Sequence, residues 1–322
     1  MTLYPGLGGQ PPWAQHLTSQ DIVAIARRAD ELGYAALDVP WHTVVRRGAE
    51  AAAYGPRWPD ALSAAGFLLG ATARICVMPL VVVPCQQPVM LAKALSTLDW
   101  MSGGRLRPGL LAGYLRSEFE FLNAAFAERG AIMDEYVAAM VELWTSENPA
   151  FNGQHVAFDG IIFEPKPAQT PLPLWFGGRA KSALRRIARY GSGWTSYATP
   201  HREMRNAIEY IRSQPEFVAN PRPLSISAYF VESGHDPLTH AQLRPRRVIV
   251  GAEEVLEQLS YLASIGIDET DPALESKPGS TGKAVPIATV GEYLERMQWF
   301  AEEIMPAAHE MKSCFAATPP ST

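Results

Sequence analysis

The chain has 322 residues, of which 47% are hydrophobic and 19% charged, so it can bury a large core and is neither disordered nor fibrous. The formal net charge is -5 with both signs interspersed, and we expect no nucleic-acid partner. No apolar run approaches the roughly 18 to 20 residues that span a bilayer, and residues 1–20 lack a leader pattern, so we expect a cytoplasmic protein with no membrane partner.

Helices and strands are predicted to alternate along the chain. Thr18 or Ser19 can cap a first helix, which Gly33 ends. Further helices are predicted over 59–71, 89–101, 134–144, 182–190, 203–212 and 253–265, and strands over 35–39, 75–83, 106–113, 174–176, 194–197 and 224–231. Because each parallel crossover needs a dozen or more residues, this alternation predicts an α/β protein with a parallel sheet. Its unit count favours a (β/α)8 TIM barrel with insertions over an open sheet.

Three segments depart from the alternation. Residues 150–167 alternate apolar and polar side chains around Gly153 and Gly160, which predicts an inserted hairpin. Residues 268–286 are rich in proline and glycine, and we expect an irregular loop there in place of an eighth strand. Residues 312–322 are expected to be a disordered tail. The whole of 1–311 is interpreted as a single domain.

The spacing of the residues excludes several common binding and catalytic motifs. The three cysteines, Cys76, Cys85 and Cys314, are far apart and form no CxxC pair, so we expect reduced thiols and no zinc. A dinucleotide fingerprint would need a third glycine at Pro11, and the pattern around Gly279 lacks two positions of a phosphate loop. No HExxH or GxSxG motif exists. We therefore expect neither a metal site nor serine-hydrolase chemistry.

One motif survives this test. Gly177, Gly178 and Arg179 follow a predicted strand and precede a predicted helix. Two glycines let backbone amides approach an anion, a helix N-terminus adds positive partial charge, and arginine offers a forked cation. The alternative interpretation is a tight strand-to-helix turn with an exposed arginine.

Segments across roughly residues 20 to 200 together resemble the bacterial luciferase-like family, in the family's order. They are ADELGY at 29–34, LDVPWH at 37–42, LAKALSTLD at 91–99, SGGRL at 102–106, RSEF at 116–119, ERG at 128–130, DEY at 134–136, FEPKP at 163–167, WFGGR at 175–179 and GW at 193–194. Each segment alone is weak, but the combination is specific.

Within that family the chain is most similar to oxidoreductases that use the deazaflavin coenzyme F420, with FMN-using monooxygenases as near relatives. The resemblance implies a (β/α)8 barrel with the cofactor at the carboxyl ends of the strands and its phosphate at Gly177, Gly178 and Arg179. It implies that His42 lies beside the ring and substrate. It also implies a non-proline cis peptide at Leu80 and Val81 behind the ring, which costs about 3 kcal/mol.

The sequence also departs from the family. Relatives usually carry an aspartate where Trp41 stands, so the acid that could orient His42 is missing. Sugar-phosphate dehydrogenases of the family place a glutamate where Tyr114 stands, so a sugar phosphate is not the expected substrate. Trp41, Trp58, Tyr114 and Tyr197 are candidate pocket walls, which would suit an apolar or ring-containing substrate. The alternative for each is ordinary packing beneath loops.

Three functional hypotheses follow. The first is an F420-dependent oxidoreductase that moves a hydride between the cofactor ring and an organic small molecule, with His42 and Tyr114 nearest the substrate. The second is a monooxygenase that uses reduced FMN and dioxygen. The third is a degenerate barrel that binds a ligand without turnover. Family likeness further suggests a homodimer.

Overall fold

The computed structural model describes residues 12–196, 199–230, 249–271, 274, 276–279 and 284–316. The helices are α1 Ser19–Glu31, α2 Ala49–Tyr54, α3 Ala61–Ala71, α4 Pro88–Ser102, α5 Arg116–Phe121, α6 Arg129–Thr145, α7 Lys181–Tyr190, α8 His201–Arg212, α9 Pro215–Ala219, α10 Ala252–Ser264, α11 Val290–Trp299 and α12 Met305–Ala316. None of the helices in these ranges has both the length and the apolar character of a membrane-crossing segment.

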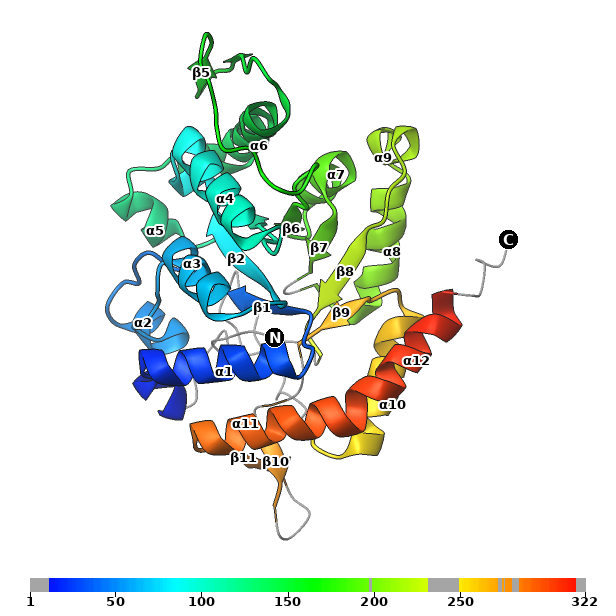
Figure 1. The fold of residues 1–322 in the computed structure, drawn as a ribbon. Helices are drawn as coiled ribbons and strands as arrows, with labels where there is room; N and C mark the ends of the chain where they lie inside the picture. Colours follow the sequence, from blue (N-terminus) through cyan, green and yellow to red (C-terminus); the bar gives the residue numbers. More distant parts are fainter. Residues whose placement is uncertain are drawn as a thin grey trace.

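Seven strands form one parallel sheet with helices packed outside it (Figure 1). In sheet order they are β1 Ala36–Val39, β2 Cys76–Val82, β3 Gly109–Leu111, β6 Trp175–Gly177, β7 Gly193–Thr195, β8 Ser225–Ala228 and β9 Glu269–Thr270. Every pairing within this sheet is parallel, and the order follows the chain. The α/β barrel class predicted from the sequence is confirmed.

An ion pair inside the sheet shows how strongly it curls. Arg107, just before β3, contacts Glu269 of β9 with Nη1 3.2 Å from Oε1. Three strands separate β3 from β9 in the sheet. Neighbouring strands lie about 4.8 Å apart, so a flat sheet would hold these two strands roughly 19 Å apart. The side chains meet because the sheet bends round a shared interior, which is barrel geometry.

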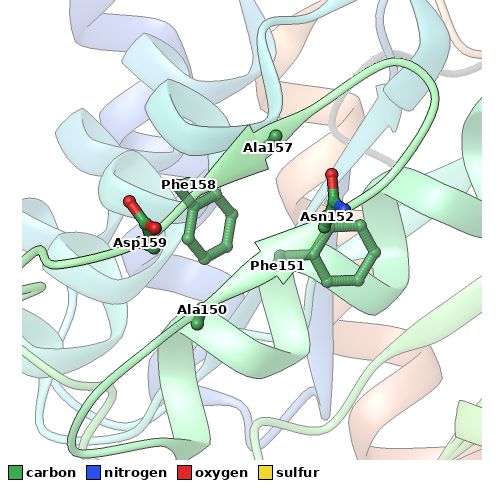
Figure 2. Close-up of a pocket in the computed structure, with 6 residues that line it drawn as sticks. All are labelled: Ala150, Phe151, Asn152, Ala157, Phe158 and Asp159. Atoms are coloured by element: carbon green, nitrogen blue, oxygen red, sulfur yellow. The ribbon is translucent and has the colours of Figure 1, made fainter.

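The segment 150–167 contains an antiparallel hairpin of β4 Phe151–Asn152 and β5 Ala157–Phe158. It projects beyond α6, away from the parallel sheet (Figure 1). Glu135 of α6 fastens the turn, because its carboxylate accepts hydrogen bonds from the amides of Gln154, His155 and Val156. An open groove of about 590 Å³ lies on this hairpin, lined by Ala150, Phe151, Asn152, Ala157, Phe158 and Asp159 (Figure 2).

Two predicted irregular segments are more ordered than expected. Residues 268–286 are not one irregular loop, because β9 extends the parallel sheet and β10 Ser276–Pro278 pairs with β11 Ala284–Pro286. The strand was missed because Glu269 turns its charge inward to Arg107 and breaks the apolar pattern. Of the segment 312–322, residues 312–316 belong to α12, which continues α11 through a π-helical turn, Phe300–Ile304, and the rest lies outside the described residues. A single helix-nucleation step is therefore sufficient for the continuous helical segment 290–316.

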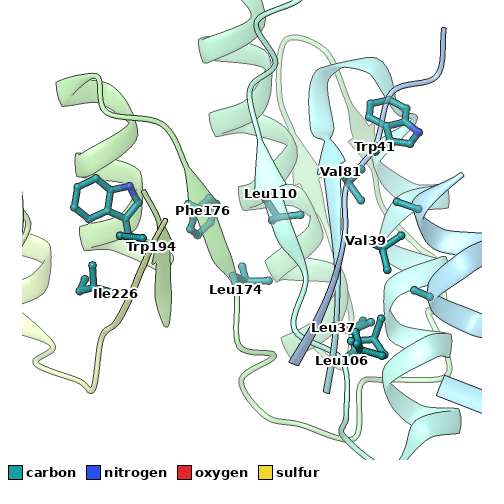
Figure 3. Close-up of a cluster of buried hydrophobic side chains, with 14 of the residues drawn as sticks. Leu37, Val39, Trp41, Val81, Leu106, Leu110, Leu174, Phe176, Trp194 and Ile226 are labelled. Atoms are coloured by element: carbon teal, nitrogen blue, oxygen red, sulfur yellow. The ribbon is translucent and has the colours of Figure 1, made fainter. Parts of the chain in front are cut away.

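The strands bury both faces. Leu110, Phe176, Trp194 and Ile226 belong to the main cluster, which also contains many buried residues of the helices (Figure 3). The alternate residues Met78, Leu80 and Trp175 form a separate small cluster with Leu111 packed against it. Since side chains alternate across a strand, this second cluster lies on the inner face of the curled sheet.

The inner face tolerates no side chain at Gly193 of β7. A Cβ atom there would overlap the indole of Trp175, which is 3% exposed and closely packed. We expect Gly193→Ala to destabilise the protein by about 1 to 3 kcal/mol, as overpacked cores do. Urea unfolding measures this. Gly70→Ala is the control, because a Cβ at Gly70 meets nothing within 4 Å; an equal loss in both variants would contradict the steric argument.

Asp30, in the last turn of α1, anchors the chain where it enters β2. Its carboxylate accepts hydrogen bonds from the amides of Ala73, Arg74 and Ile75, at 2.7, 3.0 and 2.7 Å. Burial alone would raise the pKa of Asp30, but these bonds outweigh it and lower the pKa. A lowered folded-state pKa gives stability that is present above the unfolded-state pKa and lost as pH falls through the folded one.

We therefore expect Asp30→Asn to lower the free energy of unfolding at neutral pH by roughly 1 to 3 kcal/mol. The difference from wild type should shrink as pH falls below the usual aspartate range. Urea unfolding at several pH values measures both. A difference that stays constant down to the acid limit would show that the charge of Asp30 contributes nothing.

Candidate active site

His42 lies three residues beyond the end of β1, at the carboxyl edge of the sheet, and is 6% exposed. Its Nδ1 is 3.2 Å from Oε2 of Glu118, and its Nε2 is 3.3 Å from the hydroxyl of Tyr114. Both nitrogens of the imidazole therefore have a protein partner. The structure brings together the two residues, His42 and Tyr114, that the sequence analysis placed nearest the substrate.

Glu118 is a candidate site residue that the sequence analysis did not name. It lies in the first turn of α5 and is 2% exposed, and its second oxygen accepts a hydrogen bond from the backbone amide of Thr43. The expectation that His42 lacks an acid is therefore wrong: the acid comes from α5 in place of position 41. A glutamate in the first turn of a helix is usually an exposed residue that favours the helix dipole, so the RSEF segment at 116–119 contains Glu118 without marking it as a partner of His42.

Aromatic rings enclose the imidazole on its remaining sides. Trp58 meets it edge-on with ring centroids 4.7 Å apart, Tyr54 lies at 5.2 Å and Tyr114 at 6.0 Å. The indole of Trp58 is held by a hydrogen bond to the carbonyl of Gly55. These contacts favour Trp58 as a wall of the site, whereas Trp41 belongs to the main hydrophobic cluster (Figure 3).

Tyr114 follows β3 and lies where several phenols converge. Burial raises the pKa of Tyr114 well above its ordinary value, and Tyr54, Tyr229 and Glu118 raise it further. Burial likewise raises the pKa of Tyr54. Tyr229 directly follows β8, and two strands, β6 and β7, lie between β8 and β3 in the sheet. Residues from β1, β3 and β8 thus gather at one mouth of the curled sheet, the place where barrel enzymes build their sites.

Cys85 lies in a short turn, Val83–Cys85, that follows β2. Burial and the neighbouring charge of Glu118 raise the pKa of its thiol to about 12. A thiol in that state is not a nucleophile near neutral pH, because reactivity belongs to the thiolate. The titratable side chains that are hydrogen-bonded to one another at this mouth are His42, Tyr114 and Glu118.

The end of β6 and the turn after it contain Gly177, Gly178 and Arg179, the residues of the predicted anion site. Gly177 is buried, and a Cβ atom at this position would overlap the side chain of Leu111. Gly178, at φ +104°, and Arg179 are exposed. The carbonyl of Gly178 accepts a hydrogen bond of 3.0 Å from the indole of Trp194. Among the described residues no side chain caps α7, and its first turn carries no acidic residue. The turn therefore presents an uncapped helix N-terminus beside two exposed residues.

Three buried hydroxyls lie beyond this turn. Thr195, Ser196 and Thr199 are 1, 2 and 8% exposed, and within the described part of the chain none of their hydroxyls has a hydrogen-bond partner. Thr195 pairs with Gly177 across the two strands, and its oxygen lies 3.5 Å from the position of a Cβ on Gly177. A buried hydroxyl without a partner costs about 1 to 3 kcal/mol, so this cluster needs an explanation.

The ring-backing residues behave differently from the expectation. The side chain of Leu80 belongs to the small cluster on the inner face of the sheet. The side chain of Val81 belongs to the main hydrophobic cluster (Figure 3). The cis peptides of the described residues are Glu164–Pro165 and Thr170–Pro171, so the expected cis bond between Leu80 and Val81 is wrong. That stretch is a regular strand, with Val81 paired to Leu110, which a trans chain satisfies without strain. Tyr197 lies outside the described residues.

Comparison with known proteins adds three likenesses. The model of a family described as luciferase-like monooxygenase matches residues 7–231. An FMNH(2)-dependent dimethylsulfone monooxygenase of Pseudomonas putida is 31% identical over 150 residues, which are 46% of this chain and only 40% of that protein. Another of the same description, from Pseudomonas fluorescens, is 26% identical over 67% of this chain and 54% of its own length.

Solved structures share the fold. The monooxygenase RslO1 of Streptomyces bottropensis superposes with a TM-score of 0.75 over 95% of this chain and 98% of that one, at 20% identity. An F420-dependent secondary alcohol dehydrogenase superposes with a TM-score of 0.67 over 90% of this chain and 94% of that one, at 18% identity.

Proposed function

Because the chain belongs to the luciferase-like monooxygenase family, we propose that it is an oxidoreductase that binds the deazaflavin coenzyme F420 and moves a hydride to or from an apolar or ring-containing organic substrate. The observation that carries this proposal is the hydrogen-bonded series of Glu118, His42 and Tyr114 at the barrel mouth. Hydride transfer to or from an oxygen-bearing carbon needs a proton step at the same substrate, and this series can supply it.

The residues of the turn after β6 fit the phosphate of such a cofactor. Gly178 and the uncapped start of α7 offer backbone amides, and Arg179 lies in the same turn. The buried hydroxyl of Thr195, which lacks a described partner, would gain one from a phosphate oxygen. We assign the phosphate to this corner and the ring to the inner face near Leu80. A bound deazaflavin supplies the hydride donor or acceptor, and the chain supplies orientation and the proton.

The aromatic walls define the substrate class that we propose. Trp58 and Tyr54 pack against His42, and the ring of Tyr114 lies 6.0 Å from that imidazole and 6.2 Å from the ring of Tyr54. Such surfaces favour flat or apolar molecules, with a single polar group directed to the Tyr114 hydroxyl. Among the described residues that contact His42 in these ring pairs and hydrogen bonds, none carries a positive charge that could bind a sugar phosphate.

Binding of the cofactor tests the proposal directly. Purified protein is titrated separately with F420 and with FMN, and the change in cofactor absorbance or fluorescence is followed. We expect saturable binding of F420. Well-folded protein that binds neither cofactor would sink the enzyme proposal and favour a barrel that binds some other ligand without turnover.

A second candidate is a monooxygenase that uses reduced FMN and dioxygen. It is favoured by the two sequence relatives, both described as FMNH(2)-dependent monooxygenases. The chemistry separates the two candidates, because a deazaflavin lacks the N5 that lets a flavin react readily with oxygen. Binding of FMN in place of F420, with oxygen consumption that depends on an added organic substrate, would decide for this candidate.

A further inference from the structure

The partners of His42 determine which of its nitrogens carries the proton. A carboxylate can only accept hydrogen bonds, so the contact of 3.2 Å between Glu118 Oε2 and Nδ1 requires a hydrogen on Nδ1. A neutral imidazole has only one such hydrogen, which leaves a lone pair on Nε2. The Tyr114 hydroxyl, 3.3 Å away, then donates to Nε2. The series has one direction: phenol to imidazole, imidazole to carboxylate.

We propose that Tyr114 is the residue that exchanges a proton with the substrate, that His42 stores this proton, and that Glu118 is a positioning residue that fixes the His42 tautomer. This rests on the proposed function. It assigns to Tyr114 the contact with substrate that the sequence resemblance assigned to His42.

Burial of the two groups supports this order. The imidazole is 6% exposed and is surrounded by Glu118, Tyr54, Trp58 and Tyr114, so a substrate atom has little access to it. Tyr114 is partly exposed and lies near Tyr229, on the far side of the mouth. In the described part of the chain, Glu118 is the charged side chain that makes a polar contact with His42. The phenol is therefore the accessible end of the series.

The proton balance is simple in the oxidising direction. The substrate hydroxyl gives its proton to Tyr114 Oη while the Tyr114 proton moves to His42 Nε2. The imidazolium that results is paired with Glu118, and Tyr114 is neutral before and after. The substrate C–H electron pair leaves with the hydride to the flavin-type cofactor. In the reducing direction the same proton returns from His42 through Tyr114 to the substrate oxygen. A phenol whose pKa is raised by burial suits this role, because it passes a proton without holding a charge.

The tautomer of His42 tests the proposal in cofactor-free protein. Nitrogen-15 NMR of imidazole-labelled protein at about pH 8.5, above the usual imidazole range, distinguishes the two neutral forms. The signals of His42 are identified among those of the seven histidines by their loss in a His42→Gln variant. We expect the Nδ1–H form at His42 in wild type. A predominant Nε2–H form at His42 would overturn the proposal, and because this is measured on the wild-type protein, no folding defect can obscure it.

Two substitutions at Glu118 separate positioning from packing. Glu118→Gln keeps the volume of glutamate but has only one acceptor oxygen, which the amide of Thr43 takes, so its NH2 group faces Nδ1 and should shift His42 to the Nε2–H form. Glu118→Ala removes both the acceptor and the volume and should shift the population in the same direction. Turnover with the cofactor that binds should fall roughly 100-fold in the glutamine variant as well as in the alanine variant, whereas a merely structural role for Glu118 would leave the glutamine variant close to wild type. An unchanged tautomer in a folded alanine variant would remove Glu118 from the scheme.

Controls and the cofactor titration keep the two proposals apart. Glu50→Gln makes the same chemical change at a carboxylate that accepts from Ser117, the neighbour of Glu118, and should leave His42 unchanged. His201, which contacts the carbonyl of Tyr229, is an internal reference for the spectra. Absence of binding to F420 and FMN would defeat the proposed function whatever the tautomer. An Nε2–H form in protein that does bind a cofactor would defeat the relay alone.

Discussion

Tyr114→Phe should lower turnover roughly 100- to 10,000-fold, the usual range for loss of a general acid or base. The substitution removes one oxygen and leaves the ring that packs near Tyr54, with centroids 6.2 Å apart. Cofactor affinity should stay within about threefold, because the proposed phosphate site lies in the turn after β6. Stopped-flow measurement of the cofactor absorbance gives the rate of hydride transfer, and equilibrium titration gives the affinity.

Tyr136→Phe is the matched control for this result. It makes the same chemical change on α6, in a phenol whose pKa is also raised by burial but which lies outside the hydrogen-bonded series of Glu118, His42 and Tyr114. It should leave hydride transfer unchanged. Equal rates for Tyr114→Phe and wild type would show that the proton reaches the substrate by another route.

The elements that sequence could predict are those whose signals are local. The strand over 76–82 is a run of apolar residues because both faces of a barrel strand are buried. The first helix begins where expected because Thr18 and Asp21 form a reciprocal capping box, in which each side chain bonds the other's backbone amide. These features depend on residues within a few positions of one another, and so they are visible in the chain itself.

The features that sequence could not predict depend on distant pairs. Glu118 and His42 are 76 positions apart, and only the packing of α5 against the end of β1 makes the glutamate an acid partner. Glu269 and Arg107 are 162 positions apart, and their ion pair hides a barrel strand behind a charged residue. The cis peptide expected at Leu80 came from resemblance alone. Nothing in the local sequence required it, and the strand forms without it.

Thr195→Val should change stability and cofactor affinity in opposite directions. Valine has nearly the shape of threonine but lacks the hydroxyl, which is buried without a partner in the described residues. Removing it should raise the free energy of unfolding of the cofactor-free protein by roughly 1 to 2 kcal/mol, because an uncompensated polar group no longer has to be desolvated. Affinity for the phosphorylated cofactor should fall roughly 10- to 100-fold, the value of one hydrogen bond to a charged group.

Urea unfolding without cofactor and calorimetric titration with it measure the two effects. Thr97→Val is the matched control, because the hydroxyl of Thr97 on α4 already donates to the carbonyl of Lys93. That variant should lose a little stability and no affinity. A Thr195 variant that loses stability and keeps full affinity would place the phosphate elsewhere.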